Sequence, residues 1–189
     1  MTAKKMLPAL LIAALFPLTA PPAQAEKLAG VELPNTARVG ETDLVLNGLG
    51  LRKKAIFKVY VAGLYLAEKQ SDPEAILAAD SPRKLVMEFL RKVGSDSLTG
   101  AWTDCLKNNA PSAGQDVVQG FDSLKGYMAD VKKGDQLEFT YAPGAGTVIR
   151  TAGEERGTIA GKDFADTLFS CWVGAAPPSE DFKKGLLGG

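Results

Sequence analysis

The sequence predicts an α+β fold in which a large antiparallel sheet is layered against helices. Helical patterns are grouped along the chain instead of separating every pair of strands, as a parallel sheet would require. Two strand patterns, 83–91 and 136–141, alternate apolar and polar residues, which is typical of strands with one buried face. Turn-forming Gly, Pro and Asn residues separate the short strands near the start of the chain.

The strongest strand pattern, AIFKVYVAGLYL from Ala55 to Leu66, is rich in β-branched and aromatic residues and contains no proline. Side chains alternate across a strand, so this segment divides into two sets. One face carries Phe57, Val59, Val61 and Tyr65, and the other carries Ile56, Tyr60, Leu64 and Leu66. Because both faces are apolar, we expect this strand in the middle of the sheet, covered on both sides.

Residues 1–25 have the pattern of a secretory signal peptide. Lys4 and Lys5 precede an apolar run that is too short to span a bilayer, and Ala23-Gln24-Ala25 offers a cleavage point after Ala25. An N-terminal membrane anchor is the alternative. Removing these 25 of the 189 residues leaves 164, which we interpret as a single domain, 26–189, with no transmembrane segment.

Composition excludes several classes of function. Removal of the signal peptide would take away Lys4 and Lys5 and leave 20 of the 22 basic residues beside 22 acidic ones. The resulting net charge near −2 makes nucleic acid a poor partner. There is no histidine, and there are two cysteines. Histidine-based triads, zinc sites and haem attachment are therefore set aside, and we expect neither a metal nor a cofactor.

Around the central strand, the pattern predicts short elements. From Glu26 to Gly50 we expect two or three strands, separated at Pro34-Asn35, Gly40 and Asn47-Gly48. Gly48-Leu49-Gly50 lacks the third glycine and the following helix of a phosphate loop, so we interpret it as room for close backbone approach. Further helices are predicted over 71–80, 97–109, 114–133, 163–173 and 179–187, and further strands over 83–91, 136–141, 146–151 and 157–159.

Two cysteines and two tryptophans lie on the apolar stripes of predicted helices. Cys105 and Cys171 either form a disulfide between two helices, which an oxidising compartment permits, or are small buried apolar residues. Trp102 and Trp172 are interpreted as core anchors between helices and sheet, with stacking on a ligand as the alternative.

Three segments together resemble the bacterial chalcone-isomerase-like family: GLGLRKKAIFKVYVAGLYL, DCLKNNAP and TIAGKDFADTLFSCWVGAAPPSEDFKKGLLG. The resemblance extends from about Val31 to Leu187. It implies the chalcone isomerase-like fold, an open-faced β-sandwich in which a large antiparallel sheet is layered against helices, with a ligand cleft between them.

The resemblance also implies candidate site residues. In the flavonoid enzymes of this family an arginine helps to hold a phenolate, and that arginine corresponds to Arg52. The enzymes' threonine falls on Tyr60, and their tyrosine and asparagine fall approximately on Ser97 and Asp104, so only the arginine is retained. Relatives that bind fatty acids pair this arginine with a tyrosine to hold a carboxylate, which Arg52 and Tyr60 match better.

The chemistry of Arg52 agrees with that role, because a guanidinium group can hold a planar carboxylate by two parallel hydrogen bonds. The alternative is that Arg52 belongs to a solvated basic turn with its lysine neighbours at 53 and 54. Asp104 either partners Arg52 or Lys58 or faces water. Tyr65 is interpreted as a core residue.

We therefore predict a secreted, periplasmic, non-catalytic chalcone-isomerase-like protein. It binds a small amphipathic ligand, a fatty acid or a phenolic compound, with the acidic head at Arg52 and Tyr60, and with Ser97 and Asp104 in the same site. One alternative is an intramolecular lyase that cyclises a chalcone-like enone, with Arg52 as its catalytic residue. A second is a partner-binding protein with a collapsed cleft. The sequence does not indicate an oligomeric state.

Overall fold

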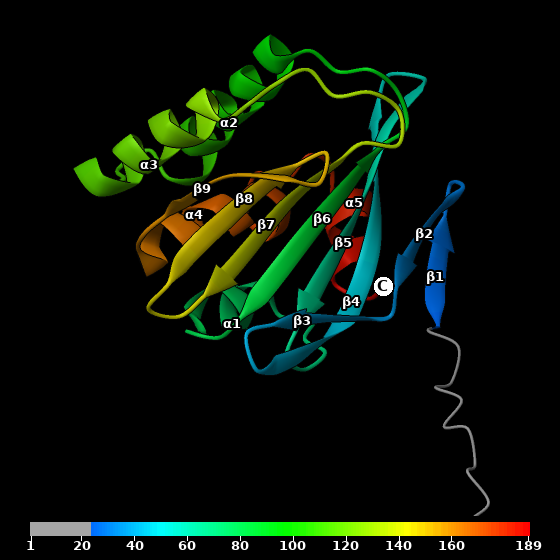
Figure 1. The fold of residues 1–189 in the computed structure, drawn as a ribbon, viewed down its shortest axis with the longest axis horizontal. Coiled ribbons are helices and arrows are strands. Elements are labelled where there is room, and N and C mark those ends of the chain that lie inside the picture. Colours follow the sequence, from blue (N-terminus) through cyan, green and yellow to red (C-terminus); the bar gives the residue numbers. More distant parts are fainter. Residues whose placement is uncertain (1–23) are drawn as a thin grey trace, which may run out of the picture.

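The computed structural model describes residues 24–189, so the predicted signal peptide, 1–25, lies almost entirely outside the described residues. Seven antiparallel strands form the main sheet in sequence order (Figure 1). They are β3 (Thr36–Val39), β4 (Thr42–Lys54), β5 (Phe57–Leu66), β6 (Arg83–Phe89), β7 (Gln136–Ala142), β8 (Gly146–Thr151) and β9 (Glu154–Ile159). A separate hairpin consists of β1 (Ala25–Leu28) and β2 (Val31–Pro34).

The helices pack on one face of the main sheet, with α4 and α5 behind it and α2 and α3 beside β9 in Figure 1. They are α1 (Pro73–Ala78), α2 (Ser95–Asn109), α3 (Gln115–Gly126), α4 (Lys162–Val173) and α5 (Glu180–Leu186). The larger apolar core lies between them and the sheet, and a smaller one lies on the opposite face, where Val31 and Leu33 of β2 pack with Val61 and Tyr65. The predicted α+β fold with a large antiparallel sheet is confirmed.

Strand β5 is central, as predicted, and both of its faces are buried. Tyr60 and Leu64 belong to the core on the helix side, whereas Val61 and Tyr65 belong to the core on the other side. The strand begins at Phe57, not at Ala55, because Ala55 has a φ of 53° and forms the turn of the β4–β5 hairpin. A left-handed residue cannot continue a strand.

The prediction that Asn47-Gly48 separates two strands is wrong, because β4 continues through it for 13 residues. The pairing with β5 shifts between Leu46 and Gly48, as it does at a β-bulge, so the two turn-type residues bend the strand without ending it. The interpretation of the glycines as sites of close approach is confirmed. A Cβ atom on Gly48 would lie 2.2 Å from the carbonyl oxygen of Gly185 in α5.

Two other boundaries differ from the prediction. Helix α3 ends at Gly126 instead of continuing to 133, and Val131 forms an isolated antiparallel bridge with Val93. Strand β9 begins at Glu154, so the turn before it is formed by Ala152 and Gly153, both with positive φ. Among residues 24–189, no helix combines the length and the apolar character needed to cross a bilayer.

Candidate functional site

A cleft of about 570 Å³ opens between one end of the sheet and helix α2. Its walls come from β4, β5 and β6, from α2 and α4, and from the loops that join β6 to α2 and α4 to α5. All four residues that the sequence singled out line it: Arg52, Tyr60, Ser97 and Asp104. The structure therefore brings together, in one cavity, residues from two strands and one helix.

Arg52 and Tyr60 are neighbours because of the β4–β5 hairpin. Their Cα atoms are direct partners in the antiparallel register. Directly opposed residues of an antiparallel pair project from the same face of the sheet, so both side chains point to the helix side. Eight positions apart in the sequence, they form one polar pair at the end of an apolar face.

Arg52 is half-buried, whereas its neighbours Lys53 and Lys54 are exposed, so it does not belong to a fully solvated basic turn. One terminal nitrogen of its guanidinium group donates a hydrogen bond to the carbonyl oxygen of Pro178. In the described part of the chain, no carboxylate lies within ion-pair distance of Arg52. The guanidinium group is therefore oriented by a neutral acceptor and keeps its charge available.

Helix α5 determines where Pro178 lies, because it packs directly on the glycines of β4. The amide group of Asn47 fixes the C-terminal end of α5 by donating a hydrogen bond to the carbonyl oxygen of Leu186 at 2.8 Å. It also donates to the carbonyl oxygen of Gln70 at 2.9 Å. The same amide accepts a hydrogen bond from the backbone nitrogen of Gln70 at 2.8 Å. This buried side chain thus connects β4, α5 and the loop before α1.

Tyr60 is 9% exposed and packs edge-on against Phe89 and Phe182, with ring centroids 5.8 Å and 5.7 Å away. Burial raises the pKa of its phenol to about 12, although the Trp172 indole and the charge of Arg52 act in the opposite direction. Tyr60 is therefore neutral at physiological pH. A neutral phenol next to a guanidinium group is a second hydrogen-bond donor for an anion.

Aromatic side chains line the cleft, and two of them, Trp102 and Trp172, pack on each other and on Phe139 of the core. Trp102 and Trp172 pack edge-on with centroids 5.6 Å apart, and Phe139 lies 5.5 Å from Trp102 and 5.4 Å from Trp172. Both tryptophans are buried core anchors, as predicted, and both also contribute to the cleft wall. Core packing and contact with a ligand are thus compatible at these two positions.

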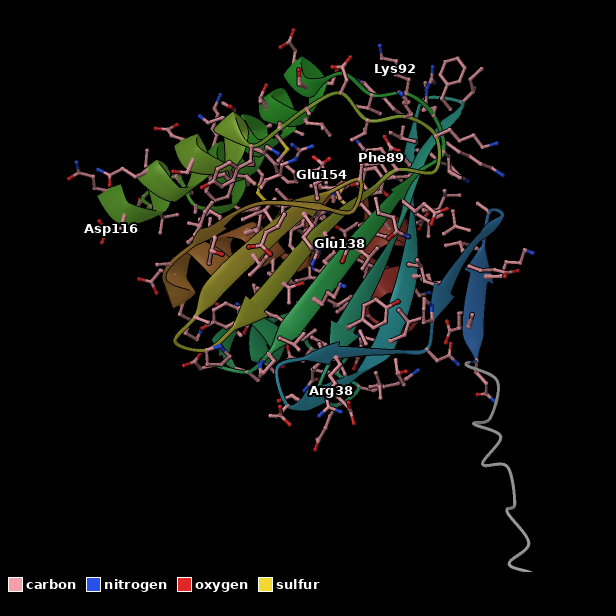
Figure 2. The ribbon with its side chains drawn as sticks, in the orientation of Figure 1. Arg38, Phe89, Lys92, Asp116, Glu138 and Glu154 are labelled. Carbon is pink, nitrogen blue, oxygen red and sulfur yellow. A yellow bond between two sulfur atoms is a disulfide. The ribbon has the colours of Figure 1, made fainter. Side chains whose placement is uncertain are left out.

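A disulfide between Cys105 and Cys171 ties α2 to α4 at the cleft wall, with the Cα atoms 5.3 Å apart. It is visible in Figure 2 as the yellow bond between the two helices. Of the two alternatives that the sequence left open, the structure has the disulfide. The wall formed by α2 is therefore covalently fixed relative to the helix behind the sheet.

Ser97 and Asp104 occupy the rim of the cleft. Both are exposed on α2, and neither forms a side-chain hydrogen bond or an ion pair with Arg52 or Tyr60 among residues 24–189. Asp104 faces water, one of the alternatives for that residue. Tyr65 lies on the opposite face of the sheet, buried, and donates a hydrogen bond to the carbonyl oxygen of Pro34 at 2.9 Å, as expected of a core residue.

Sequence reasoning missed a basic rim formed by Lys54, Arg91 and Lys92. The guanidinium group of Arg91 lies 4.5 Å from the centre of the Phe57 ring, and Lys92 pairs with Asp130 at 3.2 Å. The signal was the pair of basic residues, Arg91 and Lys92, at the end of the predicted strand 83–91. Nothing in that pattern indicates that the pair lines the same cleft as Arg52.

The charge around the cleft is therefore predominantly positive. Four cationic side chains and one carboxylate, Asp104, line it. Among residues 24–189, no three His, Cys, Asp or Glu side chains converge as a metal site would require. With an apolar interior and a cationic mouth, the arrangement suits an amphipathic anion.

Comparison with known proteins adds two findings. A family model described as chalcone isomerase-like matches residues 25–188. A crystal structure of a fatty-acid binding protein from Arabidopsis thaliana is similar to this chain with a TM-score of 0.68 and 17% sequence identity, over 87% of this chain and 96% of that chain. At that identity the likeness shows the shared fold. No curated protein matches the chain.

Proposed function

The chain belongs to the chalcone isomerase-like family, and from that membership we propose that it binds a small amphipathic carboxylate, such as a fatty acid, in the cleft headed by Arg52. One observation carries the proposal. Arg52 is half-buried at an open cleft and, among the described residues, has no carboxylate partner. A partly desolvated cation without an internal counter-ion favours an anion supplied by a ligand.

The two parts of such a ligand have different roles. Hydrogen bonds to a charged group are worth about 1.5–3 kcal/mol each, so Arg52 and Tyr60 orient the head. Each buried methylene adds about 0.8 kcal/mol before ordering costs, so the aromatic wall contributes more as the tail lengthens. The similar Arabidopsis structure is named a fatty-acid binding protein, which supports this ligand class.

The protein acts in the periplasm or outside the cell. The signal-like pattern of residues 1–25 and the Cys105–Cys171 disulfide both support an oxidising destination. Fractionation of expressing cells, followed by N-terminal sequencing, tests this proposal. Recovery from the exported fraction with Glu26 as the first residue is expected, and an uncleaved chain retained in the cytoplasm would contradict it.

Lipid extraction and mass spectrometry of the purified protein test the ligand. We expect acyl carboxylates from the wild type, and much less from Arg52→Ala. Arg38→Ala is the matched control, because Arg38 is an exposed arginine of β3 that pairs with Glu41 and Asp43, outside the cleft. An absence of acyl ligand, or equal recovery from Arg52→Ala, would refute the proposal.

The alternative of an isomerase is tested with the same proteins. The cleft holds Arg52, but it has Tyr60, Ser97 and Asp104 where the family's flavonoid enzymes have other polar groups. Turnover of a chalcone by the wild type, abolished in Arg52→Ala and retained in Arg38→Ala, would assign the intramolecular lyase activity instead. The third alternative, a collapsed cleft, does not agree with an open cavity of about 570 Å³.

A further inference from the structure

The tip of the β4–β5 hairpin, residues 53–58, exposes two adjacent apolar side chains. Ile56 is 88% exposed and Phe57 is 52% exposed. Among the described residues, the only other large apolar side chain that is exposed is Val118, on α3, at 38%. Exposing both residues at the most prominent position of a hairpin costs hydration free energy, so this tip calls for a partner that would cover it.

Cationic side chains surround these two residues. Lys53, Lys54 and Lys58 are exposed, and none of them forms an ion pair within residues 24–189. Arg91 adds a fourth charge over the Phe57 ring. Because basic and acidic residues are equal in number over the whole chain, this cluster is a local concentration of charge.

We propose that the tip docks on the surface of an anionic phospholipid bilayer. Ile56 and Phe57 enter the headgroup region, and the lysines contact the lipid phosphates. An apolar centre with a cationic border is complementary to the bilayer interface, where long lysine side chains keep their charge at the headgroups. A protein partner would have to supply both an apolar pocket and an acidic border.

The tip lies beside the cleft, so docking would bring the cleft to the bilayer; this part of the proposal rests on the proposed function. Lys54, Phe57 and Arg91 belong both to the tip region and to the cleft wall. In Figure 2, Lys92 and Phe89 mark this same end of the sheet. A docked protein would therefore hold its cleft mouth at the bilayer surface, where an amphipathic carboxylate enters without its tail crossing water.

Co-sedimentation of the purified protein with vesicles tests the proposal. Vesicles of equal parts phosphatidylcholine and phosphatidylglycerol should bind the wild type, whereas phosphatidylcholine alone should bind it weakly. Ile56→Ser should weaken binding about tenfold, because one large apolar side chain is lost. Lys53→Glu/Lys58→Glu should weaken it at least about 25-fold, since each lysine near the surface contributes about fivefold. None of these residues lines the cleft.

Matched variants control for general loss of apolar surface or charge. Val118→Ser removes the exposed apolar residue of α3, and Lys69→Glu/Lys107→Glu makes the same charge change at exposed positions outside the tip. Both should sediment like the wild type. Equal binding to the two kinds of vesicle, or equal weakening by the controls, would overturn the proposal.

Two further results separate docking from the other hypotheses. Acyl recovery in Ile56→Ser equal to that of the wild type, with lost sedimentation, would show that docking and ligand binding are distinct. Sedimentation without any acyl ligand would remove the proposed function and keep the docking. A dimer that Ile56→Ser dissociates, with no vesicle binding, would assign the tip to self-association and overturn the proposal.

Discussion

Two arginines on the same face of the sheet, Arg52 and Arg83, have opposite surroundings. Arg83 is 1% exposed, and its guanidinium group pairs with Asp166 and lies 5.0 Å and 4.8 Å from the ring centres of Tyr141 and Phe169. Arg52 is half-buried and has a single carbonyl partner. Two arginines on the same face of one sheet thus differ in charge compensation: Arg83 has a carboxylate partner, whereas Arg52, among residues 24–189, has none and lines a cavity.

The surroundings of Arg83 compensate its charge within the fold. It donates to the carbonyl oxygen of Ile76 in α1 at 2.9 Å, and its partner Asp166 in α4 also accepts from Lys162 at 2.5 Å. Arg83 thus fastens α1 and α4 to the first residue of β6. A guanidinium group whose charge is already compensated by an internal carboxylate attracts a further anion only weakly.

The largest expected effect comes from Arg83→Leu. Losing this partner of a partly buried carboxylate should lower the free energy of unfolding by about 3 kcal/mol. Denaturant unfolding measures it, with Arg38→Leu, which breaks only exposed pairs, as a control expected within about 1 kcal/mol of the wild type. If Arg83→Leu lowers the free energy of unfolding no more than Arg38→Leu does, the buried ion pair of Arg83 does not stabilise the fold as described.

Next in size is Gly48→Ala, which tests how α5 positions the carbonyl partner of Arg52. The added methyl group would meet the backbone of Gly185 and push α5 away, at about 1–3 kcal/mol. Gly100→Ala is the matched control, because a Cβ there has open space within α2 and should stabilise the helix by up to about 1 kcal/mol. Thermal unfolding of both variants compares them, and equal shifts would contradict the close contact.

Arg52→Ala should change stability less than either, by about 0.5–1.5 kcal/mol, because it removes one hydrogen bond at a site open to water. The same denaturant experiment measures this change. In combination with the lipid extraction, it separates binding from folding. A destabilisation as large as that of Arg83→Leu would mean that Arg52 is primarily a structural residue.

The smallest effect at neutral pH concerns the tyrosine beside each arginine. Burial raises the pKa of Tyr60 and of Tyr141 from 10 to about 12, and for Tyr141 a hydrogen bond to Asp80 acts in the same direction. A raised folded-state pKa means that the stabilisation is complete below pH 10 and is lost as the pH rises towards 12.

The wild type should therefore lose stability over that interval, and Tyr60→Phe and Tyr141→Phe should each reduce the loss. Unfolding curves at several alkaline pH values, with tyrosinate absorbance as the second signal, measure it. In the folded protein, the part of the tyrosinate absorbance that Tyr60→Phe and Tyr141→Phe remove should appear well above pH 10, and its appearance around pH 10 would contradict the burial of these phenols.

Much of the fold was predictable because it rests on local periodicity. The alternation in β6 and β7 and the apolar stripes of α2 and α4 are visible in short windows of sequence. The errors lie where turn-type residues serve tertiary contacts. Gly48 allows α5 to pack closely on β4, and the side chain of Asn47 forms hydrogen bonds to α5. Neither residue therefore ends β4.

The candidate site was predictable in part. Arg52 and Tyr60 were identified through a resemblance, and antiparallel pairing makes them neighbours. Arg83 left a signal that could have been used, since it has the same strand parity as the inward-facing Leu85 and Met87. A charged residue in phase with an apolar face is often a buried ion pair, but its partner in α4 is 83 positions away.

By itself, the sequence determined the α+β class and the central position of β5, because these depend on short-range patterns, whereas Arg52 and Tyr60 were identified as a pair through a family resemblance. Only the tertiary structure decided which arginine is neutralised, that Cys105 and Cys171 meet, and that Arg91 and Lys92 join the cleft. The physical reason is that charge compensation and cavity shape depend on contacts between distant segments, and local periodicity carries no information about such contacts.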